Sequence, residues 1–366
     1  MKVSRAFAVV AGVAAVLCAF VLPADALDPG ARSGPVPITQ TLRELGDRDG
    51  VFMGTAVDMT ALNNEPTYRQ RVATEFSSVT AENVMKWQLV EPTRGVLDFT
   101  AADQLVSFAK ANGQRVRGHT LVWHNQLPAW LTAGVADGTI TPAALRDILR
   151  QHITDEVTHF KGKVAQWDVV NEAFNEDGTM RNSIWLQNLG SDYIVDAFRW
   201  AHQADPKVKL FYNDFNLEAL SPKSDAAFAL VQRLREQGVR IDGMGIQGHL
   251  AARFPTPPTI QENLKRFSDL GLITELTEAD VRLDLPVDAT KLLAQSEGYR
   301  VMLDACLLTV RCKGFTVWGF TDLHSWVPGV FAGQGAACIL DETLRPKPAY
   351  QGLRTELVLA SVERED

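Results

Sequence analysis

The side chains from which metal centres are usually built are scarce in this sequence. It contains four cysteines and seven histidines among 366 residues, and no group of them has the spacing of a zinc site. No serine–histidine or cysteine–histidine pair suggests a nucleophile with its base. We therefore expect a protein that works without a metal and without a cofactor.

Positive charge is also in short supply. Lysine and arginine together number 36 against 44 acidic residues, which gives a formal net charge of −8. Nucleic acids and anionic membrane surfaces are bound by basic patches, and the balance here is the opposite. We expect neither of them as a partner of the mature chain, and we expect the chain to be a monomer.

One long apolar run occurs, and it lies at the N-terminus over residues 6–22. Lys2 and Arg5 precede it, and the small-x-small triplet at 24–26 follows it. The run is slightly short for a membrane span, and nothing basic follows it. The pattern predicts a secretory signal peptide over residues 1–26 and therefore a secreted, extracellular protein. A membrane anchor is the alternative.

Low-complexity linkers are missing from residues 42–357, so we expect a single catalytic domain there, with a leader at 27–41 and a tail at 358–366. Apolar strand-like runs alternate with amphipathic helices along this region. The eight runs cover residues 51–57, 77–83, 114–123, 164–173, 208–214, 242–250, 272–280 and 314–322. Such alternation is typical of a parallel sheet covered by helices, and eight units predict an α/β fold of the closed (β/α)8, or TIM barrel, type.

Helix boundaries are marked by capping residues in several places. Ser221 before Pro222 predicts a helix start. Thr259 and Glu262 have the spacing of a capping box, and Gly271 fits the position just after a helix end.

Polar side chains gather where the predicted strands end. In a parallel barrel these carboxyl ends meet on one face, where barrel enzymes place their chemistry. For any one residue a simple strand cap is the alternative, but capping does not explain the same pattern on seven strands. The polar residues at strand ends include Glu82, Asn83, His119, Asn171, Glu172, Gln247, His249, Glu278 and Asp280.

Two glutamates at different strand ends, without a metal, suit glycoside hydrolysis, which needs one carboxyl group as acid and base and a second as nucleophile or base. Indole rings add to this interpretation, because sugar faces pack on them. Each ring taken singly could equally belong to the core. The tryptophans at or just beyond strand ends are Trp87, Trp123, Trp130, Trp318 and Trp326.

Several motifs occur in one order along the chain and carry a specific resemblance. They are TAENVMKW (80–87), HTLVWHNQLPAW (119–130), DVVNEA (168–173), YNDFN (212–216), GIQGHL (245–250), TEAD (277–280), VWGFTDLHSWVPG (317–329) and PKPAY (346–350). Together they resemble glycoside hydrolase family 10, the endo-β-1,4-xylanases. The resemblance implies a (β/α)8 barrel with a cleft for β-1,4-xylan and hydrolysis with retention of configuration.

The resemblance also implies roles for single residues. Glu172 matches the acid/base, Glu278 the nucleophile, and Asn171 the neighbour that binds the 2-hydroxyl of the reacting sugar. His249 matches the residue bonded to the nucleophile, with Gln247 beside it. Trp318 and Trp326 match the rings around the reacting sugar. Residues matching the non-reducing side of the cleft are Glu82, Asn83, Lys86, His119, Trp123 and Gln126.

The chain departs from the family pattern in three places. Ala279 stands where a leucine is usual, and Phe215 stands where a tyrosine is common. Phe215 keeps a stacking surface without the hydroxyl, so we expect altered acceptor-side binding and intact chemistry. The family also lacks a usual counterpart to Thr274 and Glu275.

Glu275 and Glu278 each follow a threonine, and both are candidates for the nucleophile. The strand begins near residue 272, so Glu275 falls in mid-barrel and Glu278 at the rim. Only Glu278 is followed, after one residue, by an aspartate, Asp280, as in the family. Side chains three apart on a regular strand leave opposite faces. We therefore assign the nucleophile to Glu278 and expect Glu275 on the helix-facing side, held by a hydrogen bond or an ion pair.

Cys306 and Cys312 flank one short segment of an exported chain, where a disulfide could join a helix end to the next strand. Two buried free thiols are the alternative, and Cys338 is left over. For the function, two alternatives to a xylanase stay open: a retaining barrel glycosidase acting on cellulose or mannan, and a catalytically inactive carbohydrate-binding barrel.

Overall fold

The computed structural model describes residues 39–363. The predicted signal peptide and all but the last three residues of the predicted leader lie outside the described residues. The described chain soon enters helix α1, Leu42–Asp49, which Thr41 caps. The Thr41 hydroxyl accepts from the Glu44 backbone N–H, and the Glu44 carboxylate accepts from the Thr41 backbone N–H, so both ends of a capping box are made.

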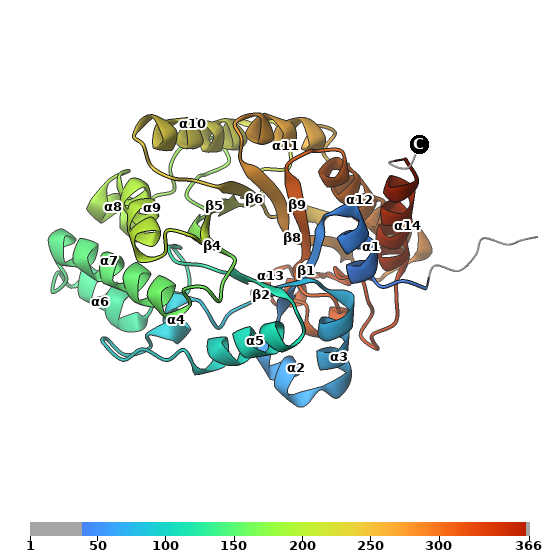
Figure 1. Ribbon diagram of the computed structural model, residues 1–366, viewed down its shortest axis with the longest axis horizontal. Helices are drawn as coiled ribbons and strands as arrows, with labels where there is room; N and C mark the ends of the chain where they lie inside the picture. The colour runs from blue at the N-terminus through green and yellow to red at the C-terminus, as the bar shows by residue number, and fades with distance from the viewer. Residues whose placement is uncertain (1–38, 364–366) are drawn as a thin grey trace, which may run out of the picture. The chain divides into compact units, whose positions relative to one another are not determined.

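Eight parallel strands form the centre of the protein (Figure 1). Neighbouring strands pair in chain order, and β8 also pairs with β9, which closes the sheet into a barrel. The barrel strands are β1 Phe52–Val57, β2 Ser78–Ala81, β3 Arg115–Gly118, β4 Gln166–Asn171, β5 Lys209–Asp214, β6 Gly243–Ile246, β8 Ile273–Asp284 and β9 Cys312–Val317. All eight lie within or overlap the predicted runs, and the predicted (β/α)8 barrel is confirmed.

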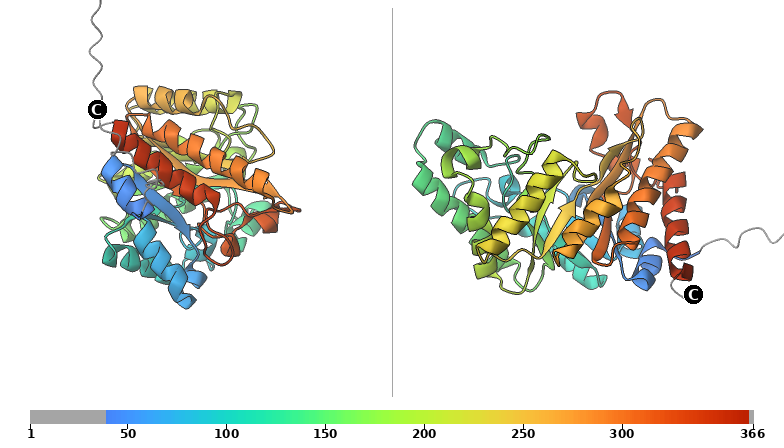
Figure 2. Two further views of the ribbon diagram at one scale, coloured as in Figure 1. Left: turned by 90° about the vertical axis from the view of Figure 1, so that its right-hand side faces the viewer. Right: turned by 90° about the horizontal axis from the view of Figure 1, so that it is seen from above.

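The helices cover the outside of the barrel, as the two further views show (Figure 2). Two short strands, β7 His249–Ala251 and β10 Gln334–Gly335, pair with the part of β8 that continues beyond the barrel. Besides α1, the helices are α2 Met59–Asn64, α3 Pro66–Glu75, α4 Trp87–Val90, α5 Thr100–Ala111, α6 Ala129–Ala136, α7 Pro142–His159, α8 Ile184–Leu189, α9 Tyr193–Ala204, α10 Pro222–Glu236, α11 Ile260–Asp269, α12 Ala289–Leu307, η1 Asp322–His324, α13 Val327–Val330 and α14 Pro348–Glu363.

The predicted helix boundaries are confirmed, including the start of α11 after Thr259, but one predicted capping interaction is not made. Ser221 caps α10 by accepting from the Ser224 N–H, and Gly271 follows α11 with a φ of 82°, the left-handed conformation that favours glycine. The capping box at Thr259 is wrong. Its hydroxyl accepts from the Leu220 N–H at 3.0 Å and so ties the start of α11 to the loop between β5 and α10.

Strand β8 carries an irregularity that positions the site. Against β9, Leu276 pairs with Phe315 and Ala279 pairs with Val317, so three steps along β8 match two steps along its neighbour. On the other side, the Glu278 N–H donates to the carbonyl of Gln247, the residue that follows β6. One extra residue in a strand is a β-bulge, and it reverses the alternation of side chains beyond it.

The C-terminal region packs on the outside of the barrel. Helices α12 and α14 lie side by side (Figure 2), joined by an ion pair of 3.0 Å between Arg300 and Glu356. The tail predicted from residue 358 is wrong over residues 358–363, which continue α14. The predicted disulfide is confirmed: Cys306 and Cys312, with Cα atoms 5.2 Å apart, join the end of α12 to β9. Cys338 is buried and free.

Candidate active site

A cavity of about 720 Å³ opens at the carboxyl ends of the barrel strands. Every residue predicted for catalysis or substrate binding lines it, although the residues come from segments far apart in the sequence. They are Glu82, Asn83, Lys86, His119, Trp123, Gln126, Asn171, Glu172, Phe215, Gln247, His249, Glu278, Trp318 and Trp326. Asp280 lies behind this wall, fully buried.

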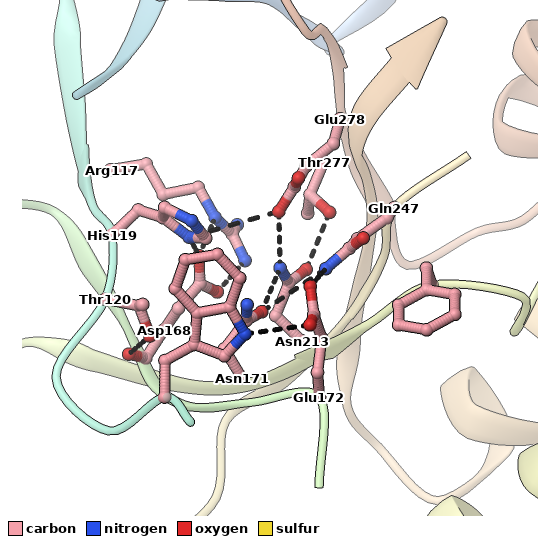
Figure 3. A network of polar contacts seen from close by, with 12 residues as sticks. Arg117, His119, Thr120, Asp168, Asn171, Glu172, Asn213, Gln247, Thr277 and Glu278 are labelled. Atoms are coloured by element: carbon pink, nitrogen blue, oxygen red, sulfur yellow. Dashed lines mark hydrogen bonds and ion pairs between the residues drawn. The ribbon is translucent and has the colours of Figure 1, made fainter. Parts of the chain in front are cut away.

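Glu172 is held at the end of β4 in an uncommon backbone conformation. Its φ is +58°, and its N–H donates to the Asn213 carbonyl at 2.9 Å, which ties the turn to β5. Its two carboxylate oxygens accept from the Trp123 indole at 2.8 Å and from the Gln247 amide at 3.1 Å (Figure 3). The carboxyl group is thus fixed in direction while it remains part of the cavity wall.

Glu278 faces Glu172 across this network from β8. The Asn213 side-chain amide donates to its Oε1 at 2.7 Å, and His249 Nε2 lies 3.1 Å from its Oε2. Burial by itself would raise the pKa of Glu278. The hydrogen bond with His249, and the positive charges of His119 and His249, outweigh burial and lower the pKa below its usual value. The site therefore favours an ionised carboxylate at Glu278.

His249 lies between two carboxylates. Nε2 contacts Glu278, and Nδ1 forms an ion pair of 3.0 Å with Asp280. Burial opposes the imidazolium, but the charges and hydrogen bonds of Asp280 and Glu278 outweigh it and raise the pKa of His249 to about 10. Asp280 also accepts from the Trp326 indole N–H at 2.7 Å. One buried aspartate thus orients both the histidine beside Glu278 and a ring in the cavity wall.

A second polar group forms the side of the cavity that follows β2. The Asn83 side-chain oxygen accepts from both Lys86 and Gln126, at 3.2 Å each. The Lys86 ammonium group also lies 4.9 Å from the centre of the Trp123 ring. Burial lowers the pKa of Lys86 and raises that of Glu82. Amide, ammonium and carboxyl groups beside an indole ring suit the hydroxyl groups and the apolar face of a sugar.

His119 is supported from the barrel interior. Its Nδ1 lies 2.9 Å from Asp168 on β4 and 3.9 Å from Glu278. Arg117, two residues earlier on β3, binds both oxygens of Asp168 (Figure 3). Burial would raise the pKa of Asp168, but the charge of Arg117 outweighs it and lowers the pKa. Neither Arg117 nor Asp168 was predicted as a site residue, although a charged residue inside an apolar strand is a usable signal.

The predicted direction of Glu275 is wrong. Its carboxylate accepts from Arg117 on β3 at 2.8 Å and from Gln166 on β4 at 2.6 Å. Both strands lie across the barrel from β8, so Glu275 faces the interior, as Glu278 does. Side chains three apart leave opposite faces only on a regular strand. The bulge between Leu276 and Ala279 makes β8 irregular, so both glutamates can face the interior. The expected ion pair and hydrogen bond exist, but inside the barrel.

Five further residues line the cavity that sequence reasoning did not assign: Asn125, Asn216, Arg282, Val330 and Phe331. Most lie in loops beyond the strand ends, where no periodic pattern marks a direction. Within residues 39–363, no group of three or more histidine, cysteine, aspartate or glutamate side chains is arranged to hold a metal ion. No helix among the same residues is long and apolar enough to cross a membrane.

Comparisons with known proteins agree with this geometry. The model of the family described as Glycosyl hydrolase family 10 matches residues 41–356. An endo-1,4-beta-xylanase of Agaricus bisporus is 46% identical over 303 residues, which cover 82% of this chain and 90% of the relative. Endo-1,4-beta-xylanase B of Thermotoga neapolitana is 40% identical over 316 residues, 86% of this chain and 90% of the relative.

A solved structure gives the same result. Xylanase 10B of Thermotoga petrophila, in complex with xylobiose, superposes with a TM-score of 0.85 and 40% identity, and the match covers 89% of this chain and 99% of the other. With the barrel and the two carboxyl groups at its rim, these matches assign the chain to an established family of enzymes. The chain belongs to glycosyl hydrolase family 10.

Proposed function

We propose that this glycoside hydrolase is a secreted endo-β-1,4-xylanase that cleaves internal bonds of xylan with retention of configuration. One observation carries the proposal most directly. Two carboxyl groups, those of Glu278 and Glu172, face one cavity and are joined through the side chains of Gln247, Asn171 and Asn213. Two carboxyl groups at one site are what a double displacement requires.

In the first step, Glu172 donates a proton to the leaving glycosidic oxygen while Glu278 attacks the anomeric carbon, so that a glycosyl-enzyme forms. In the second step, Glu172 removes a proton from water while the water oxygen attacks the anomeric carbon, and the bond to Glu278 breaks and releases the sugar. Although burial opposes it, the hydrogen bond with His249 and the neighbouring positive charge lower the pKa of Glu278 and so keep it nucleophilic. The reaction needs no metal and no cofactor.

The remaining cavity residues bind and orient the glycan in this proposal. Asn171 binds the 2-hydroxyl of the reacting sugar, and His119, Trp123 and the group at Glu82, Asn83, Lys86 and Gln126 bind the non-reducing side. Trp318 and Trp326 wall the reacting sugar. A wall at this point favours xylose, because the CH2OH arm of glucose would clash with it.

The name of each relative supports xylan as the substrate, and the apolar N-terminal run supports secretion. We also propose that the mature enzyme acts as a monomer, without nucleic acid or membrane as a partner.

The substrate test compares release of reducing ends from xylan, carboxymethylcellulose and mannan. We expect xylan to be hydrolysed at least about tenfold faster than the other two, because a single steric clash is worth a few kcal/mol. Proton NMR of the first product should show the β-anomer before mutarotation. A preference for cellulose or mannan would overturn the substrate, and binding of xylan without turnover at any pH would indicate a carbohydrate-binding barrel.

A further inference from the structure

Three hydrogen bonds from different parts of the chain hold the backbone around Glu172. The Glu172 N–H donates to the Asn213 carbonyl at 2.9 Å, and the next N–H, that of Ala173, donates to the Tyr212 hydroxyl at 3.0 Å. The Glu172 carbonyl accepts from Nε of Arg181 at 3.0 Å. Two of these bonds therefore come from the barrel strand β5, and the third comes from a side chain of the loop that follows Glu172.

This loop brings Arg181 back to Glu172, nine residues earlier in the chain. The Arg181 N–H donates to the Ala173 carbonyl at 2.8 Å, which closes the loop at its base. Gly178 lies in the turn with a φ of 82°, and a Cβ atom there would lie 2.7 Å from the Pro222 carbonyl oxygen. Only glycine allows this turn to pack so closely on the start of α10. The sequence of the loop thus serves to return the arginine to the active site.

The guanidinium group of Arg181 is held in one orientation. Nε donates to the Glu172 carbonyl, and Nη2 donates to the Phe174 carbonyl at 3.4 Å. The carbon atom of the group lies 5.7 Å from the centre of the Phe215 ring, on the acceptor side of the cavity. Because the guanidinium donors point in fixed directions, two carbonyls and a ring leave the group little freedom. Arg181 itself does not line the cavity.

The direction of the Glu172 carboxyl group depends on this backbone support. A φ of +58° is uncommon for a residue with a side chain, and such a conformation persists only where its surroundings hold it. A change in this conformation would turn the carboxyl group away from Trp123 and Gln247, which donate to it. Proton transfer requires the acid within hydrogen-bond reach of the reacting oxygen, so a small displacement slows the reaction.

We propose that Arg181 is a positioning residue for the acid/base: its hydrogen bond to the Glu172 carbonyl fixes the backbone that aims the carboxyl group at the glycosidic oxygen. The inference rests on the proposed function, in which Glu172 is the acid/base. Because Arg181 lies outside the cavity wall, it acts through Glu172 and not on the sugar. Its contact with Phe215 gives the acid/base and the acceptor ring a common support.

The test compares two substrates whose leaving groups differ in their need for a proton. Phenolate is a poor leaving group and needs an acid, whereas 2,4-dinitrophenolate leaves without one. Arg181→Met removes the donors and keeps an unbranched side chain. We expect kcat/KM on phenyl xylobioside to fall about 10- to 100-fold, and kcat/KM on 2,4-dinitrophenyl xylobioside to stay within about twofold.

The second chemical step gives an independent signal in the same variant. Release of the sugar from Glu278 needs Glu172 as a base whichever aryl group has left. On the dinitrophenyl substrate, kcat should therefore fall about tenfold while kcat/KM does not. A variant that is merely less stable would lose activity on both substrates by one factor. Equal losses of kcat/KM on the two substrates, or no loss on either, would overturn the proposal.

Arg311→Met is the matched control. Arg311 also donates from Nε to a backbone carbonyl, that of Leu272 at 3.1 Å, but this carbonyl lies just before β8, at the amino end of the barrel. We expect the ratio of the two kcat/KM values to stay at its wild-type value. A ratio that changes alike in Arg311→Met and Arg181→Met would overturn the proposal, since loss of any arginine–carbonyl bond would then have the same effect.

A second variant keeps the test decisive if Arg181→Met does not fold. Arg181→Gln retains a neutral donor but lacks the charge and the forked geometry of the guanidinium group. We expect the same pattern with a smaller loss of kcat/KM on phenyl xylobioside, about threefold or more, as one weakened hydrogen bond predicts. An unchanged ratio of the two kcat/KM values would overturn the role of Arg181. A wild-type enzyme that hydrolyses neither xylan nor an aryl xylobioside would overturn the proposed function instead.

Discussion

The barrel holds two glutamates three residues apart on one strand, and their surroundings give them opposite properties. Glu275 and Glu278 both face the interior, and both are 5% exposed. Burial raises the pKa of Glu275 despite the attraction of Arg117, whereas hydrogen bonding and charge from His249 and His119 lower that of Glu278 despite burial. Only Glu278 lines the cavity.

This difference shows that depth of burial does not assign a role to a carboxyl group. Two features distinguish the surroundings of Glu278 from those of Glu275: the hydrogen-bond donors that each carboxylate meets, and its access to the cavity. Glu275 has an arginine and an amide as donors and no free space. Glu278 has an amide and an imidazolium beside an open volume. A general rule follows: a reacting carboxylate is better recognised by its partners and by the space in front of it.

The largest effect on activity is expected when Glu278 is replaced by alanine. Glu278→Ala should lower kcat on an aryl xylobioside by about 10⁴-fold or more, because the nucleophile is lost. Added azide should restore turnover and give the α-glycosyl azide. Glu275→Ala should keep turnover within about tenfold and should not respond to azide. Rescue of Glu275→Ala in place of Glu278→Ala would reverse our assignment.

The buried network of Arg117, Asp168 and Glu275 should lose most stability when its cation, Arg117, is removed. Arg117→Met leaves Asp168 and Glu275 buried without their common partner. We therefore expect the free energy of unfolding, measured in urea, to fall by about 3–5 kcal/mol. Lys265→Met is the control, because Lys265 forms an exposed pair with Asp269. That variant should change stability by no more than about 0.5 kcal/mol. Similar losses in both variants would mean that burial of the network contributes nothing special.

Glu278, at the rim of the barrel, should respond to loss of its cationic neighbour His249 by a change in the pH dependence of activity. His249 is charged over the working range, since its pKa is raised to about 10. His249→Gln removes that charge beside Glu278, so the acid limb of kcat/KM should move to higher pH by about one unit. An unmoved acid limb would contradict the action of His249 on Glu278.

His249 also gives a stability prediction of definite sign. Its pKa in the folded protein lies above the value of 6.5 for an unperturbed histidine, so folding favours the protonated ring. This contribution is complete below pH 6.5 and is lost as the pH rises through about 10. Thermal unfolding of the wild type should therefore show a decline over this range that is smaller in His249→Gln. An equal decline in the two proteins would place its cause elsewhere.

The smallest expected effect concerns the acceptor side of the cavity. Phe215 lines it, with the Lys223 ammonium group 3.4 Å from the ring centre. Phe215→Tyr adds a hydroxyl, and one new hydrogen bond of about 1 kcal/mol should raise kcat/KM on xylan about fivefold. On an aryl xylobioside, which offers no acceptor sugar, we expect no change. A change on both substrates would mean that Phe215 affects the chemistry rather than acceptor binding.

The sequence predicts the barrel well because period and strand-end chemistry are local signals. The eight strands and most of the residues lining the cavity follow from runs such as 208–214 and from polar pairs such as Asn171 and Glu172. It fails where a local signal has two solutions. Thr259 has the spacing of a capping box but bonds to another loop, and the direction of Glu275 depends on a bulge that pairing with β9 imposes.

The bulge in β8 has a consequence for insertions and deletions. Beyond it, every side chain of the strand takes its face from the count of residues between Leu276 and Ala279. Loss of Thr277 would turn Glu278 away from the cavity while leaving the glutamate itself in the chain. Substitutions at Thr277 or Ala279 keep this count and are the milder change. In aligning relatives of unequal length along this strand, gaps therefore belong before Thr274, where they leave the catalytic register intact.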